Sequence, residues 1–489
     1  MTKIGIAVAL AGTLAACDSL LEVELPGAVI EEETFVPNQA GLLVASAIAS
    51  IECAYSDFTA FEGAGAEDVA TRTVGWWGGR FERPPTPGAG GGCAGAQENS
   101  SGTWFKPLHN GRWLAEQVYD RLENEWDVSQ VANREELMAT AAIYTGIVYS
   151  HFGEFFCEVT ADGGPLMSWD ASLQLAEQWF TTALGHIAAA GDFEIETDVT
   201  TSAQQMAYLL RARARFAQNT PAKNAEAVLD AQQVTQGFTS FVTREAGAER
   251  TRVNRVYTGH VGLGWIALLG PINWWTGDPN PATGTPWPAV IPYTGYWELA
   301  ILPDGRAVSD AGNPITLADA GSVADSRVPV EDVGGGSGIG SGGPNNYPRW
   351  EQRKYASQDD DFPLAKWEEA WLIRAQVAGG QTAIDLVNDI RTAHGLPQVT
   401  YVAAGDAAGI QNMLIEEIRR THFLEGGRFW ATKLRYNLWF PRGEDADQWN
   451  FTYQGGVRMV FPTGEFTQNT NLTLADQASL CPQYQEPII

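Results

Sequence analysis

The sequence predicts a mainly α-helical protein, in which stacked helical hairpins are interrupted by an irregular, loop-rich insert. Two observations predict this fold class. Toward both ends of the chain, apolar residues recur at the spacing of a helix with one buried face. Between residues 237 and 350 that period is lost, Gly and Pro are frequent, and aromatic residues are crowded together. Because 44% of the 489 residues are hydrophobic, the chain can bury a large core.

Four helices are predicted in the first helical region, residues 104–235. Their apolar faces are formed by Leu114, Val118, Leu122 and Trp126; by Leu137, Ala141, Tyr144, Val148 and Phe152; by Leu173, Ala176, Phe180, Ala183 and Ile187; and by Ala203, Ala207, Leu210, Ala214 and Ala217. The first helix is expected over residues 111–126, and Asp170 stands where the third helix would have its N-cap. Two consecutive helical pairs of this size predict stacked hairpins of tetratricopeptide type.

A second helical region is predicted at about residues 360–436, and its helices begin near Leu364. Trp367 and Trp371 lead the first of them. The other two have apolar faces formed by Ala383, Leu386 and Ile390 and by Ile410, Leu414 and Ile418. Gly395 and Pro397 stand where the middle helix would stop. No linker is long or polar enough to divide the chain, so residues 17–489 are predicted to form a single domain.

A secretory leader is predicted at residues 1–16. One cation, Lys3, precedes an apolar run over residues 4–14, and small residues precede Cys17. The sequence LAAC at residues 14–17 resembles a bacterial lipobox, whose cysteine is acylated and becomes the mature amino terminus. We therefore expect lipid on Cys17 to anchor the chain to a membrane, the alternative being an ordinary cleaved signal peptide. No later stretch is predicted to be long and apolar enough to cross a bilayer.

Cysteine usage is typical of an exported chain. Apart from Cys17, the sequence has an even number of cysteines, which could form two disulfides in three possible connectivities. These disulfide candidates are Cys53, Cys93, Cys157 and Cys481. Four free thiols are the alternative. None of the four is arranged as CxxC, so neither a zinc cluster nor a redox pair is indicated.

Composition and motifs exclude several classes of function. The formal net charge of −28 argues against nucleic acid as a partner, since nucleic acid requires a basic face on the protein. Residues 338–343 satisfy GxGxxG, but Pro344 follows and no helix is predicted to start there. There is no GxSxG, no HExxH and no His pair at i,i+4, and the acidic run at residues 359–361 is predicted to be a solvated turn. The protein is therefore predicted to be no enzyme and to hold no cofactor and no metal.

A charged segment near the C-terminus, IEEIRRTHFLEGGRFWATKLRYN at residues 415–437, is the most specific motif. The residues that carry it are Glu416, Arg419, Arg420, Phe423, Leu424, Glu425, Gly426, Arg428, Trp430, Leu434 and Arg435. They resemble the E-x-x-R-R-x-x-F-x-x-E-G-x-R-x-x-D-L-x-R region of the SusD/RagB family. Read on their own, Arg419, Arg420, Glu425 and Arg428 predict a partly buried ion-pair network that fixes helix packing.

Further motifs of the same family follow in the expected order, with departures. The matching residues are Asp325 to Val328, Lys354, Tyr355, Glu369, Leu372 to Gln376, Ala383, Asn388, Arg391, Gly395 to Pro397, Phe461, Pro462 and Glu465. Gln376 stands where the family usually has Glu, and Ser326 where Pro is common. Ala431 or Thr432 occupies the usual position of Asp. These departures concern local salt bridges more than the fold.

The resemblance implies both a fold and a function. SusD/RagB proteins are outer-membrane, nutrient-binding lipoproteins with a SusD-like α superhelical fold, and they cap a TonB-dependent transporter on the cell surface. By this resemblance we expect a SusC-like TonB-dependent transporter as partner and an oligosaccharide or, as in some members, a peptide as ligand. Two alternatives stay open: a protein-binding helical scaffold without a small-molecule ligand, and a lipid-anchored glycan hydrolase.

The family holds sugar in an arc of aromatic rings, which is drawn from a loop before the first long helix and from the central irregular region. Two stretches of this chain match the arc in place and kind. The predicted ligand-binding residues are Trp76, Trp77 and Arg80 in the first stretch and Trp274, Trp275, Trp287, Tyr293, Tyr296 and Trp297 in the second. Aromatic faces suit the apolar C–H surface of a pyranose, while its hydroxyls are left for hydrogen bonds.

Overall fold

Helices form most of the computed structural model. It describes residues 34–65, 70–71, 104–246, 252–257, 267–268, 300–301, 323–324, 326–332, 350–396, 398–399, 402–436, 440–442, 452–454, 458–459 and 461–477. The longer helices are α3 (Ala40–Gly65), α4 (Phe105–Asp120), α5 (Arg134–Phe155), α6 (Trp169–Ala190), α8 (Ala203–Ala217), α9 (Pro221–Ala231), α13 (Trp367–Ala378), α14 (Gly380–Ala393), α15 (Ala407–Thr421) and α16 (Arg428–Arg435). The short ones are η1 (Pro37–Gln39), the π-helical turn η3 (Arg121–Glu125), α7 (Glu196–Val199), α10 (Arg255–Tyr257), α17 (Thr463–Gln468) and α18 (Leu474–Gln477).

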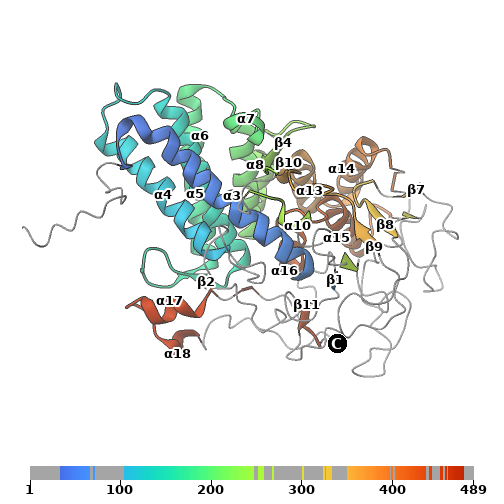
Figure 1. Ribbon diagram of the computed structural model, residues 1–489. Helices are drawn as coiled ribbons and strands as arrows, with labels where there is room; N and C mark the ends of the chain where they lie inside the picture. The colour runs from blue at the N-terminus through green and yellow to red at the C-terminus, as the bar shows by residue number, and fades with distance from the viewer. Residues whose placement is uncertain are drawn as a thin grey trace, which may run out of the picture.

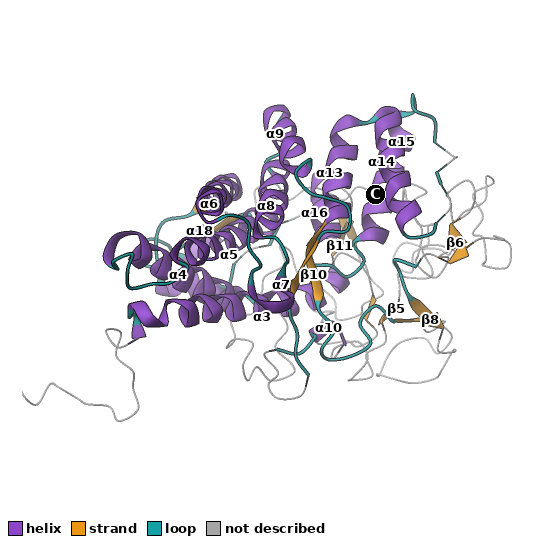
Figure 2. Ribbon diagram, turned by 90° about the horizontal axis from the view of Figure 1, so that it is seen from above, coloured by secondary structure: helices purple, strands orange, loops and turns teal. Residues whose placement is uncertain are grey.

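Consecutive helices pack against each other along the chain, as stacked hairpins require. α4 contacts α5, α5 contacts α6, α8 contacts α9, and α13 contacts α14. Helices α3 to α6 lie at one end of the molecule and α13 to α15 at the other, with α8 between them (Figures 1 and 2). The predicted fold class, mainly α with stacked helical hairpins, is confirmed.

The described strands form six separate antiparallel pairs. The strands are β1 (Ala70–Thr71), β2 (Glu158–Val159), β3 (Met167–Ser168), β4 (Thr239–Val242), β5 (Ala267–Leu268), β6 (Ala300–Ile301), β7 (Val323–Ala324), β8 (Val330–Asp332), β9 (Trp350–Gln352), β10 (Phe362–Lys366), β11 (Phe440–Arg442) and β12 (Thr452–Gln454). They pair as β1 with β5, β2 with β3, β4 with β10, β6 with β7, β8 with β9 and β11 with β12. In the β4–β10 pair Phe362 lies opposite Val242. This pair joins the first residues of the predicted insert to the strand that immediately precedes α13.

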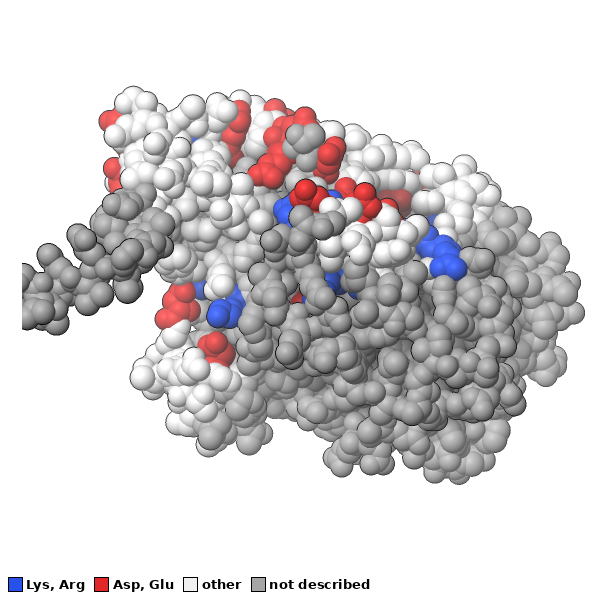
Figure 3. Space-filling view, viewed as in Figure 1, with Lys and Arg blue, Asp and Glu red and all other residues white. Residues whose placement is uncertain are grey.

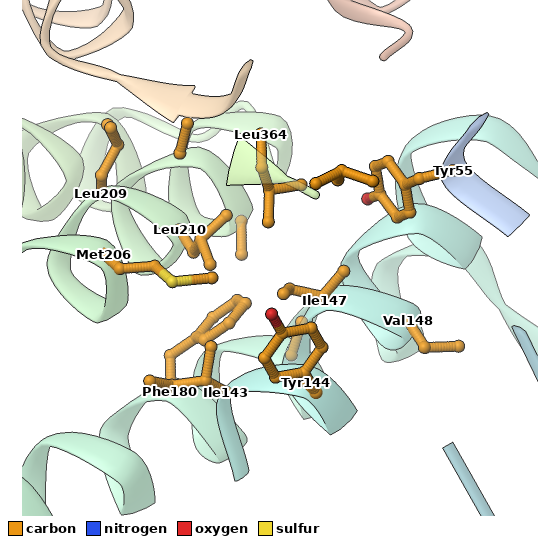
Figure 4. Close-up of a cluster of buried hydrophobic side chains, with 14 of the residues drawn as sticks. Tyr55, Ile143, Tyr144, Ile147, Val148, Phe180, Met206, Leu209, Leu210 and Leu364 are labelled. Atoms are coloured by element: carbon orange, nitrogen blue, oxygen red, sulfur yellow. The ribbon is translucent and has the colours of Figure 1, made fainter. Parts of the chain in front are cut away.

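The core is continuous across the helical pairs. Figure 4 shows Tyr144 and Ile147 of α5, Phe180 of α6 and Leu210 of α8 pointing toward one another, and each is at most 1% exposed. Gly146 allows the α5–α6 approach, because a Cβ there would lie 2.7 Å from the Phe180 ring. Small side chains in α8 serve the same close packing.

Helix α3 has no counterpart among the sequence predictions. It packs against α4 and α5, and its sequence is apolar or small almost all round, so it lacks the polar face that makes a helix visible as a pattern. Residues Pro37–Ala60 are long and apolar enough to cross a membrane by length and composition, although 67% of the 18-residue apolar window within them is buried inside the protein. The prediction that no stretch after the leader meets this criterion is therefore wrong, and burial makes α3 a core helix.

Three local predictions are also corrected. The N-cap of α6 is Ser168, whose side chain accepts a hydrogen bond from the Ala171 amide, while Asp170 lies within the first turn. The helix predicted over residues 111–126 is α4, which begins at Phe105. Trp126 lies just beyond the π-helical turn, in extended backbone. Residues 362–366 are strand β10, so the helix begins at Trp367.

Candidate functional site

All nine predicted ligand-binding residues lie outside the described part of the chain. They are Trp76, Trp77, Arg80, Trp274, Trp275, Trp287, Tyr293, Tyr296 and Trp297. Cys17, Cys93 and Cys481 also lie outside it, as does the glycine-rich segment at residues 338–343. The structure therefore constrains the candidate site through the segments that flank these residues.

The stems of the two aromatic stretches are hydrogen-bonded to each other. Strand β1 pairs antiparallel with β5, with Ala70 opposite Leu268 and Thr71 opposite Ala267. Five positions after Thr71 the chain reaches Trp76, and six positions after Leu268 it reaches Trp274. The sequence matched these stretches to the family in place and kind; the pairing of their stems is a finding of the structure.

Cys53 in α3 and Cys157 after α5 are both disulfide-bonded. Both residues are less than 9% exposed, and the Cys157 Sγ also lies 3.5 Å from the Arg458 carbonyl oxygen. The connectivity stays a prediction, because the other two candidates lie outside the described residues.

Residues of the charged motif take part in two clusters of buried ion pairs. Arg428 donates two hydrogen bonds of 2.8 Å to Glu154 of α5 and lies 3.5 Å from Glu369 of α13. Arg213 of α8 donates to the same Glu369 at 2.7 and 2.6 Å. Burial alone would raise the pKa of Glu369, but Arg213 and Arg428 hold it below its ordinary value. This cluster connects α5, α8, α13 and α16.

The second cluster surrounds Glu425, just before α16. Its carboxylate accepts hydrogen bonds from Lys354 and, at 2.8 Å, from Lys366, and it contacts His422 at 3.0 Å. Although burial raises the pKa of Glu425, the two lysines and His422 hold it well below its usual range. The predicted network is thus confirmed for Glu425 and Arg428, and Arg420 pairs with Glu416 at 2.6 Å.

A cavity of about 240 Å³ lies beside the first cluster, between α8, α13 and α16. Glu154, Arg213, Glu369 and Arg428 form its charged side. Its remaining lining includes Trp169, Phe216, Leu372, Leu434, Arg435 and Arg458. These residues come from six separate stretches of chain, so sequence reasoning had no local signal with which to find the cavity. The family motifs had marked Glu369, Leu372, Arg428, Leu434 and Arg435, but for their resemblance and not for a shared cavity.

His151 is the most isolated ionisable group of this region. It is fully buried on α5, packed against the rings of Phe58 and Phe155 at centroid distances of 4.4 and 4.9 Å. Among the described residues neither ring nitrogen has a hydrogen-bond partner. Burial, aided by the charge of Arg428, lowers the pKa of His151 from 6.5 to about 3. The imidazole is therefore a neutral core side chain.

This burial predicts a pH-dependent stability. The unfolded chain binds a proton on His151 near pH 6.5, whereas the folded chain binds it only near pH 3. As the pH falls from 6.5 to 3, the His151 contribution should therefore lower the free energy of unfolding by about 1.4 kcal/mol per pH unit. His151→Leu, of similar size, should remove this contribution to the slope. His109, whose pKa burial likewise lowers to about 3, and opposing groups such as Glu52 titrate equally in both proteins. Urea unfolding at several pH values measures the difference, and equal slopes in the two proteins would contradict the assignment.

Acidic side chains are prominent on the molecular surface. On the face shown in Figure 3, Asp and Glu gather around α7, where Glu196 and Asp198 are exposed. The described residues of this face form no continuous basic surface of the kind that nucleic acid requires. Within the described ranges, no group of three or more His, Cys, Asp or Glu side chains is placed to hold a metal ion.

Stacked helical hairpins with a loop-rich insert define the class of fold, and solved structures identify it more closely as SusD-like. No family model and no curated protein matches the chain. A SusD-like protein from Bacteroides fragilis NCTC 9343 matches with a TM-score of 0.52 and 11% identity, over 91% of this chain and 98% of that one. A SusD superfamily protein from Bacteroides vulgatus ATCC 8482 matches with a TM-score of 0.50 and 13% identity, over 83% and 89%. A SusD homolog from Parabacteroides distasonis ATCC 8503 matches with a TM-score of 0.50 and 11% identity, over 81% and 84%. The chain has the SusD-like fold, as its motifs predicted.

Proposed function

We propose that the protein is a cell-surface lipoprotein of the outer membrane that binds an oligosaccharide and delivers it to a SusC-like TonB-dependent transporter. The observation that carries this proposal is the SusD-like fold, shared over 91% of this chain and 98% of the Bacteroides fragilis protein. The family that the C-terminal motif resembles works in this way. Because one fold can serve several functions, features of this chain itself are needed as further support.

The aromatic stretches supply the first such feature. The β1–β5 pair brings their stems together although about 200 residues separate them in sequence. An extended chain spans at most about 3.6 Å per residue, so Trp76 and Trp274 are each within about 22 Å of this strand pair. Chain length therefore permits both stretches to contribute rings to one site. Such rings would bind a pyranose through stacking and apolar contact, without bond cleavage.

Replacing both Trp76 and Trp77 with alanine is expected to weaken glycan binding by about tenfold or more, because each aromatic contact contributes about 0.5–1.5 kcal/mol beyond its buried area. The melting temperature should change little. Trp113→Ala is the matched control, since this indole is 42% exposed on α4, outside the two stretches. Calorimetry with a glycan selected on an array measures the effect. Unaltered affinity in the double variant would remove the first stretch from the site.

The anchor is tested separately. Cys17→Ser should move the protein from the membrane fraction into the detergent-free soluble fraction, because an acylated cysteine is the proposed attachment point. Ser19→Ala, two positions away, should leave the protein with the membranes. Fractionation followed by immunoblotting measures both. A serine variant that sediments like the wild type would contradict lipid anchoring at this residue.

The function as a whole is tested on the purified mature chain with an array of glycans and peptides and by affinity purification from envelopes. Saturable glycan binding together with co-purification of a large β-barrel protein is the expected result. A barrel partner without any array signal would favour the protein-binding scaffold. Release of reducing ends from a bound polysaccharide would favour the hydrolase. Binding of peptides alone would replace the oligosaccharide by a peptide nutrient.

A further inference from the structure

The cavity between α8, α13 and α16 has the size and walls of a small-molecule site. Its volume is about 240 Å³, which is more than the space that a single water molecule needs. Leu372 and Ile373 of α13 and Leu434 of α16 give it apolar walls. A molecule of roughly ten non-hydrogen atoms with an apolar body would fill this space.

The lining of this cavity carries more positive than negative charge. Its two carboxylates, Glu154 and Glu369, are already paired with Arg428 and Arg213. Among the described lining residues, Arg435 adds a further guanidinium that pairs with no carboxylate, and the guanidinium of Arg458 lies in the same lining. This local excess of cations occurs in a chain whose formal net charge is −28. The cavity therefore favours an anionic group.

The guanidinium of Arg435 is positioned by Phe216 and can bind such an anionic group. Its guanidinium carbon lies 3.5 Å from the centroid of the Phe216 ring. The guanidinium donates a hydrogen bond of 2.8 Å to the Phe216 carbonyl oxygen and one of 3.5 Å to the side-chain oxygen of Asn224. Among the described residues no carboxylate lies within 4.0 Å of it, and α16, with the sequence RFWATKLR, contains no acidic residue. The Tyr436 hydroxyl also interacts with this guanidinium. Because a guanidinium has five N–H donors, donors remain for a ligand beside the Phe216 carbonyl, Asn224 and Tyr436.

Arg458 adds a second stacked cation to the lining. Its guanidinium carbon lies 4.2 Å from the Trp169 ring centroid. Burial lowers the pKa of Arg458 from 12.5 to about 10, an effect that the Glu154 charge opposes. Burial likewise lowers the pKa of Arg435. An anion in the cavity would stabilise both cations.

We propose that this cavity binds a small organic carboxylate, whose anionic group pairs with Arg435 and whose apolar part contacts Leu372, Ile373 and Leu434. A carboxylate accepts two parallel hydrogen bonds from one guanidinium. The Arg435 guanidinium suits this geometry because its contacts with Phe216 already fix its position. An inorganic anion would leave the apolar walls uncovered, so the carboxylate must carry an apolar body. The proposed site does not depend on the proposed transport function.

Phenylacetate and phenylacetamide are the probes, because they share one apolar body and differ in charge. Titration calorimetry with the full mature chain should give saturable binding of phenylacetate, with phenylacetamide and acetate each about tenfold weaker or more. Equal affinities for acid and amide would overturn the proposal. So would the absence of saturable phenylacetate binding up to millimolar concentrations.

Two variants and one control assign the binding to this cavity. Arg435→Gln should weaken phenylacetate binding about tenfold or more and leave phenylacetamide unchanged. Arg374→Gln is the matched control, because Arg374 also stacks on an aromatic ring, 4.9 Å from Trp371, but does not line the cavity. Ala431→Leu keeps every charge and fills part of the cavity, so it should weaken the binding of phenylacetate. This variant tests the site even if Arg435→Gln fails to fold. Unchanged phenylacetate affinity in folded Arg435→Gln or in Ala431→Leu would place the binding elsewhere and refute the site.

Discussion

Replacing Arg428 with alanine is expected to lower the free energy of unfolding by about 3–5 kcal/mol, the usual cost of removing one partner from a buried ion pair. The two hydrogen bonds to Glu154 would be lost, and this carboxylate is only 5% exposed. Glu369 would lose one of its two cations and keep Arg213. Urea unfolding monitored by circular dichroism measures the change.

A second substitution tests whether an uncompensated charge causes this loss. On the Arg428→Ala background, Glu154→Gln should restore about 1–2 kcal/mol, since it removes the buried charge that has lost its partner. If Glu154→Gln instead lowers stability further by the same amount as in the wild type, the two residues are not energetically coupled. Glycan affinity measured well below the melting temperature should stay close to that of the wild type in both variants, because Arg428 has a structural role in this assignment.

The charged motif shows which part of such a network can be predicted from sequence. Four charges within ten residues, next to a tryptophan, predicted buried ion pairs, and Arg428 and Glu425 form them. Their partners could not be predicted, since Glu154 is 274 residues from Arg428 and Lys366 is 59 residues from Glu425. Local sequence indicates that a charge needs a partner, whereas tertiary packing decides which one it receives.

The helices show a similar limit. Helix α6 was predicted because polar residues separate its buried positions, whereas α3 was missed because its apolar and small residues leave no polar face. The strand pairs were missed for another reason: β1 and β5 have two residues each and lie about 200 residues apart. Two residues contain no measurable alternation of polar and apolar side chains.

Replacing Gly427 with alanine is expected to lower the free energy of unfolding by about 2–5 kcal/mol. Gly427 has φ +82° at the start of α16, a conformation that costs an L-residue about 1–2 kcal/mol. A Cβ would also overlap the Phe155 ring and lie 2.7 Å from Cε1 of Phe58. Overpacking of this kind adds about 1–3 kcal/mol. Both rings also pack against His151, so they cannot move away from the new Cβ without disturbing the core.

Gly426→Ala separates these two costs, because the neighbouring glycine also has a positive φ of +52° but more space. The nearest atoms to its Cβ would be 3.7 Å away on Tyr55, an ordinary contact. This control should therefore lose only about 1 kcal/mol, the backbone cost alone. Denaturation of both variants in urea, with equal m-values, measures the contrast. Equal losses at the two positions would mean that backbone conformation, and not the Phe58 and Phe155 rings, requires glycine before α16.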